Sequence, residues 1–74
     1  MTEITIDPDI CHGKPVIKGT RIMVANILSL LAGGYNLKQV QDYYPELKLN
    51  QIKEAIGFAT SLVQEEEIIL HQKA

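Results

Sequence analysis

The chain has 74 residues, 46% of them hydrophobic, one cysteine and a formal net charge of −2. This length allows one small domain (residues 1–74), while the cysteine count excludes an internal disulfide and the charge excludes a uniformly basic surface. Because a domain of this size buries only about 60% of the surface that its unfolded chain exposes, we expect oligomerisation to stabilise it. With no apolar run near ~20 residues and no signal-peptide pattern at the start, we expect a cytoplasmic protein without a membrane partner.

Residues 1–23 are predicted to form a β-hairpin arm. Residues 4–6 are a short β-prone run that ends at a proline-containing turn. Residues 16–17 and 21–23 flank a lysine–glycine pair, which is typical of a tight hairpin with Gly19 at positive φ. The run at residues 4–6 is expected to pair with one of these strands, either in its own chain or in a neighbouring subunit.

Two short helices are predicted after the arm. Apolar residues recur at i, i+3, i+4 and i+7 from Val24, and the glycine pair at residues 33–34 ends this first helix. Asn36 and Gln39 have the spacing of a capping box for a second helix. That helix is expected to stop near Tyr44, because the proline that follows disfavours helical geometry in the residue before it.

A third helix follows residue 48 and completes a helix-turn-helix core over residues 24–63. The helical pattern continues through residues 64–74, an extension longer than the first two helices can cover. The sequence therefore predicts a mainly α fold, a three-helix helix-turn-helix domain of the winged-helix or homeodomain type with a small N-terminal β-hairpin.

The first turns of the third helix are the candidate DNA-recognition element, because a helix-turn-helix places them in the major groove. Asparagine and glutamine can pair with adenine, and lysine can reach guanine or phosphate. The alternative is a set of ordinary solvated residues, which the acidic second half favours: residues 41–74 carry six acidic and three basic side chains. The outward polar residues are Lys48, Asn50, Gln51, Lys53 and Glu54.

Basic residues on the hairpin form a second candidate DNA contact. Lys14, Lys18 and Arg21 could touch backbone phosphates as a basic wing. The alternatives are simple surface charge, or an ion pair of Arg21 with Asp7 or Asp9 that braces the N-terminal segment.

The third helix also carries more apolar surface than one small core can cover, and exposed apolar surface marks an interface. We expect its far end to contact a second subunit or a partner protein, together with the first strand. The alternative is a tail that frays or folds back on that strand. The predicted interface residues are Ile4, Ile6, Phe58, Leu62, Ile69 and Leu70.

Residues able to carry catalysis or bind a metal are few and scattered. Cys11, His12 and His71 lack the spacing of a zinc site or of a nucleophile–base pair. A phosphate-binding loop at Gly13 is excluded because Pro15 stands where serine or threonine should be. The sequence therefore predicts no catalytic residue, no metal, no small-molecule cofactor and no enzymatic activity.

Several of these features occur together in one known family. They are Asp7-Pro8, the hairpin at residues 13–22, the glycine pair, Tyr44-Pro45 and Leu47. With them the chain resembles, over roughly residues 4–59, the small bacterial antitoxin-like proteins of the domain-of-unknown-function family 433. That family usually has threonine at the Lys48 position. This chain lacks a good N-cap there, so its third helix is expected to start later, at Asn50.

The resemblance implies a homodimeric helix-turn-helix protein whose partner is a PIN-like, nuclease-type toxin encoded nearby. The first hypothesis is therefore an antitoxin that binds its own operator DNA as a dimer and neutralises that toxin. The second is a protein-interaction module of the same fold without DNA binding, which the net charge of −2 favours.

Overall fold

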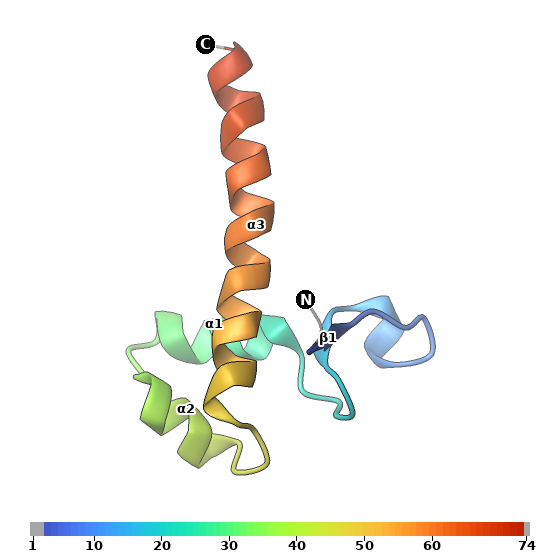
Figure 1. Cartoon of the computed structure of the whole chain (residues 1–74), viewed down its shortest axis with the longest axis vertical. Coiled ribbons are helices and arrows are strands. Elements are labelled where there is room, and N and C mark those ends of the chain that lie inside the picture. The colour runs from blue at the N-terminus through green and yellow to red at the C-terminus, as the bar shows by residue number, and fades with distance from the viewer. Residues whose placement is uncertain (1–2, 74) are drawn as a thin grey trace.

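The computed structural model describes residues 3–73, with side chains through residue 64 (Figure 1). Its elements are β1 (Ile4–Thr5), the 3-10 helix η1 (Cys11–Gly13), β2 (Val16–Ile17), α1 (Val24–Ala32), α2 (Leu37–Tyr43) and α3 (Leu49–Lys73). α1 and α2 lie beside the first half of α3, and the second half of α3 extends away from both. The predicted fold class, three helices with a small antiparallel β-pair at the N-terminus, is confirmed.

The length of α3 sets the shape of the molecule. At about 1.5 Å per residue its 25 residues span about 37 Å, whereas the nine residues of α1 span about 14 Å. The longest dimension of the chain is accordingly 43 Å. α1 and α2 can therefore cover only the first turns of α3, as the sequence predicts.

The two strands of the arm pair within one chain. β1 is antiparallel to β2, with Ile4 opposite Ile17. β2 also meets the segment that precedes α1, where Val16 forms a bridge with Met23. The predicted hairpin therefore forms, and the first strand adds to it from its own chain.

The hairpin turn is wider than the predicted lysine–glycine pair. Gly19 has the expected positive φ of 78°, but the turn spans residues 18–21 because the backbone N–H of Ile17 donates to the carbonyl of Ile22 at 3.0 Å. Inside it, the Thr20 hydroxyl donates to the Ile17 carbonyl at 2.8 Å and accepts from the Ile22 N–H at 3.0 Å. Threonine thus satisfies the backbone groups that a two-residue turn would pair directly.

The arm and the helices share one hydrophobic core. Because buried apolar side chains contribute about 1.5–3 kcal/mol each, the arm is bound into the domain by its buried isoleucines and valine. Leu47, in the turn between α2 and α3, is 2% exposed, and its side chain anchors that turn in the core. The buried residues are Val16, Ile17, Ile22, Val24, Ile27, Val40, Leu47, Ile52 and Ala55.

A capping box fixes the start of α2, and the proline that follows fixes its end. The N–H of Gln39 donates to Asn36 Oδ1 at 2.8 Å, and the N–H of Asn36 donates to Gln39 Oε1 at 2.9 Å. This is the predicted capping box, and α2 ends at Tyr43, directly before the residue that the proline constrains. Of the two glycines between α1 and α2, it is Gly34 that adopts a positive φ, 101°.

The glycine turn generates a stability prediction. Replacing Gly34 with alanine should lower the free energy of unfolding by about 1–2 kcal/mol, because a Cβ disfavours its positive φ. Urea denaturation followed by circular dichroism measures the change. Gly33, whose φ is −79°, is the matched control, and a larger loss for Gly33→Ala than for Gly34→Ala would contradict the assignment.

Candidate functional site

The buried side of α3 determines which of its residues face outward. Ile52 and Ala55 are fully buried against the core, so the opposite side of the first turns is exposed. Asn50, Lys53, Glu54 and Gly57 follow one another there at the helical spacing i, i+3, i+4 and i+7; Glu54 is half-buried and the other three are exposed. We call these four residues the outer face of α3.

The outer face of α3 is hollowed. Its four residues line an open depression of about 380 Å³. The depression is open at Gly57, where a Cβ would meet no atom within 4 Å. Amide, ammonium and carboxylate groups are those that pair with adenine, guanine and cytosine in the major groove. The outer face therefore has the chemistry and the access that base contacts require.

Gln51 lies beside the outer face and is committed to the fold. The backbone N–H of Lys48 donates to Gln51 Oε1 at 2.8 Å, while Gln51 Nε2 donates to Glu3 Oε1 at 3.1 Å. These bonds use one lone pair of the amide oxygen and one of the two amide N–H groups, so they fix the orientation of the Gln51 side chain against the fold. The predicted start of the third helix at Asn50 is wrong by one residue: α3 begins at Leu49, since Gln51 caps Lys48 from within the helix.

Glu3 joins the hairpin to the start of α3. Its carbonyl accepts from the backbone N–H of Lys18 at 2.8 Å, and its carboxylate accepts from Gln51. Glu3 thus makes a hydrogen bond to each of the two predicted DNA-contact regions, which are about 30 positions apart in the sequence. Sequence reasoning missed Glu3, because nothing in its local pattern indicates a partner 48 positions away.

The basic residues of the hairpin are exposed. Lys18 and Arg21 both project into solvent, as do Lys48 and Lys53 at the start of α3. Within the described side chains, Arg21 forms no ion pair with Asp7 or Asp9, so the predicted brace is not formed. Asp7 instead accepts the N–H of Asp9 at 2.8 Å and shapes its own turn. Arg21 is therefore available to an external anion.

Cys11 and His12 form with Gly13 a turn in which all three φ angles are positive (51°, 57° and 80°). The thiol of Cys11 donates to the carbonyl of Arg21 at 3.6 Å, which ties this turn to the hairpin. No group of three potential metal ligands occurs within the part of the chain that the structure describes. None of the described helices has the length and apolar character needed to cross a membrane.

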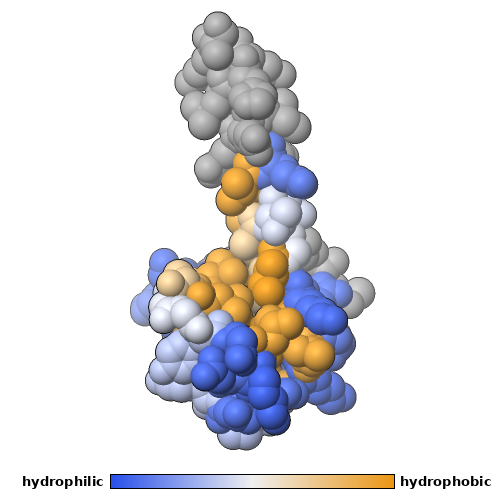
Figure 2. All heavy atoms as spheres, turned by 90° about the vertical axis from the view of Figure 1, so that its left-hand side faces the viewer, coloured by the Kyte–Doolittle hydropathy of each residue, from blue (hydrophilic) through white to orange (hydrophobic). Residues whose placement is uncertain are grey.

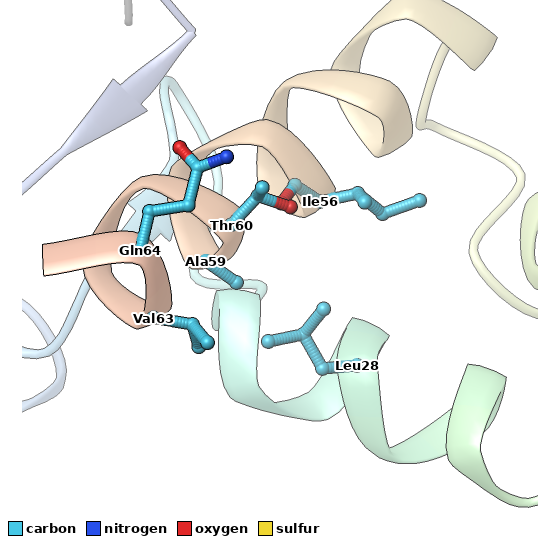
Figure 3. A pocket seen from close by; sticks show the side chains of 6 residues that line it. All are labelled: Leu28, Ile56, Ala59, Thr60, Val63 and Gln64. Atoms are coloured by element: carbon cyan, nitrogen blue, oxygen red, sulfur yellow. The ribbon is translucent and has the colours of Figure 1, made fainter. Parts of the chain in front are cut away.

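A second surface lies where α3 leaves α1. Leu28 of α1 points toward Ala59 and Val63 of α3 across an open groove of about 450 Å³ (Figure 3). Hydrophobic side chains continue from the body of the domain up one side of α3 (Figure 2). Val63, which lines the groove, is 59% exposed. Helical periodicity puts Leu28 and Val63 on the apolar faces of their helices but does not predict the groove between them. The groove depends on how far α1 reaches along α3, which periodicity alone does not give.

The predicted interface residues divide into three groups. Ile4 and Phe58 are half-buried and pack against the core. Ile6 and Leu62 are exposed, at 61% and 48%, and remain available to a partner. Ile69 and Leu70 lie outside the residues whose side chains the structure describes.

The fold and the outer face of α3 define a three-helix helix-turn-helix domain with a β-hairpin arm. Residues 4–59 match the family model described as protein of unknown function (DUF433), and the chain belongs to this family. The match contains the arm, α1, α2 and the covered part of α3, and it stops at Ala59, in the apolar groove. The continuation of α3 therefore lies beyond the part that the family model describes.

The chain is also similar to the uncharacterized protein y4eO of Sinorhizobium fredii (strain NBRC 101917 / NGR234). The two are 32% identical over 56 residues, which is 76% of this chain and 25% of that protein. The chain thus spans about a quarter of the length of this curated relative. No solved structure matches it.

Gln51 generates a second stability prediction. Gln51→Ala should lower the free energy of unfolding by about 1 kcal/mol or more, because the cap on Lys48 and the bond to Glu3 are both lost. Lys53→Ala, on the same exposed turns, should stay within about 0.5 kcal/mol. Urea denaturation of both variants measures this, and equal losses would contradict the role given to Gln51.

Gly57 generates a prediction of the opposite sign. Gly57→Ala should raise the free energy of unfolding by about 0.5–1 kcal/mol, because alanine favours the helix and the added Cβ meets open space. Thermal unfolding of the purified variant measures the gain. A loss of stability would mean that this part of α3 is not the exposed helix described above.

Proposed function

We propose that this protein is an antitoxin-type transcription regulator: it binds its own operator DNA as a homodimer and neutralises a PIN-like nuclease-type toxin. The observation that carries the DNA-binding half is the outer face of α3, which is polar, solvent-exposed and opposite the buried side of a helix-turn-helix. The antitoxin half draws on the family resemblance and on the apolar surface that α3 leaves uncovered.

The DNA contact divides into base reading and phosphate binding. In this proposal Asn50, Lys53 and Glu54 face base edges in the major groove, and Gly57 lets the helix approach the duplex closely. Lys18 and Arg21 on the hairpin reach the flanking phosphates. Because the chain has a net charge of −2, its affinity depends on these few contacts, is sensitive to salt, and gains from two linked copies in a dimer.

The partner contact uses the other side of α3. The groove lined by Leu28, Ala59 and Val63, with exposed Leu62 nearby, offers apolar surface of the kind that an amphipathic helix and its receptor bury. Neutralisation by such a contact is steric and needs no catalytic group. In this proposal the protein acts in the cytoplasm as a binding protein and not as an enzyme.

A charge-matched pair of variants tests the DNA-binding half. Lys53→Gln should weaken binding to the DNA upstream of the gene about tenfold or more, because it removes the outer face's cation. Gln64→Glu makes the same change in net charge on the groove side and should stay within about twofold. A mobility-shift assay at about 50 mM salt measures both.

The mobility-shift assay is carried out with and without the product of the neighbouring gene. If the wild-type protein shifts no DNA in either case, the DNA-binding half is wrong. The second candidate function, a protein-interaction module without DNA binding, is favoured by the acidic balance of residues 41–74. A neighbouring product that co-purifies with the chain and loses its activity in the complex, with no DNA shift, would establish that candidate instead.

A further inference from the structure

The contact between Glu3 and Gln51 places a carboxylate at the start of α3. The Glu3 side chain is half-buried, and Gln51 Nε2 donates to its Oε1 at 3.1 Å. The carbonyl of the same residue holds the backbone of Lys18 at 2.8 Å. Glu3 therefore lies between the two regions proposed to contact DNA, the hairpin turn and the first turn of α3.

A negative charge in this position has two effects of opposite sign. The first N–H groups of a helix carry partial positive charge, so a carboxylate beside them stabilises the folded chain. The same charge repels the phosphates that Lys18 and Lys48 would otherwise attract. It also holds one N–H of the Gln51 amide and so orients this amide toward Glu3, away from an external base or phosphate.

We propose that Glu3 is an autoinhibitory residue of the nucleic-acid site: its carboxylate, bound to Gln51, lowers the affinity of the hairpin and of α3 for a polyanionic duplex. This inference rests on the proposed DNA-binding function and adds a regulatory element to it. The N-terminal strand then has two tasks. It completes the β-pair of the arm, and it sets the affinity of the recognition helix below what the exposed lysines alone would give.

The chemistry of glutamate separates charge from hydrogen bonding. Glu3→Gln removes the charge but keeps an oxygen that can accept from Gln51, whereas Glu3→Ala removes both. Asp9→Asn, at an exposed residue in the loop between β1 and β2, makes the same change in net charge and serves as the control. At separations within a Debye length, one charge changes its interaction with a nearby phosphate enough to alter affinity about threefold.

The experiment measures binding of the full chain to a nonspecific duplex at about 50 mM and about 300 mM salt, with the salt needed for elution from heparin as a second readout. Glu3→Gln and Glu3→Ala should bind about threefold or more tightly than Asp9→Asn at low salt. The difference should shrink at high salt, because screening removes it. Urea denaturation of each variant verifies that the compared proteins are folded.

Each possible result either supports or overturns the autoinhibitory role of Glu3. It is overturned if neither Glu3 variant binds the nonspecific duplex more tightly than Asp9→Asn does, or if the gain in affinity is unchanged at high salt. A gain for Glu3→Ala alone would locate the inhibition in the hydrogen bond that orients the Gln51 amide and would overturn the charge mechanism. A different result would show that the proposed operator binding is wrong. The wild-type chain and the variants would then bind the gene's own upstream DNA no better than the nonspecific duplex.

Discussion

The burial of Ile52 and Ala55 against α1, α2 and the arm is the constraint on which the rest of the structure depends. It fixes the rotation of α3 about its axis, because a helix that turns by one residue would expose one of these side chains and bury a charged one. With that rotation fixed, the outer face is polar and open. The side toward α1 becomes apolar where the shorter helix ends.

A single amide then links the two halves of the fold. Gln51 caps the start of α3 and also holds Glu3, so the arm and α3 share one hydrogen-bonded junction. Local stability and the charge around the candidate DNA surface are thus set by the same few atoms. Farther along α3, Val63 and Leu62 stay exposed because no element of the described chain reaches them. The first turns of α3 and the stretch around Leu62 and Val63 therefore offer different surfaces, one polar and one apolar.

How far the sequence predicts this structure follows from the range of each interaction. The capping box of Asn36 and Gln39, the positive φ at Gly19 and the stop before the proline depend on neighbouring residues, and all three are predicted correctly. The Glu3 contact joins residues 48 positions apart and leaves no local pattern. The groove beside Leu28 depends on relative helix lengths and packing, so periodicity identifies its apolar residues but not their exposure.

The most direct measurement is a titration of isotopically labelled protein with the duplex upstream of its gene, followed through backbone amide chemical shifts. If the account is correct, the shifts concentrate on residues 48–57 and on the hairpin turn at residues 18–21, and the amides near Leu28 and Val63 change little. Shifts confined to the groove residues, or none at about 50 mM salt, would contradict the assignment of the outer face of α3 to DNA.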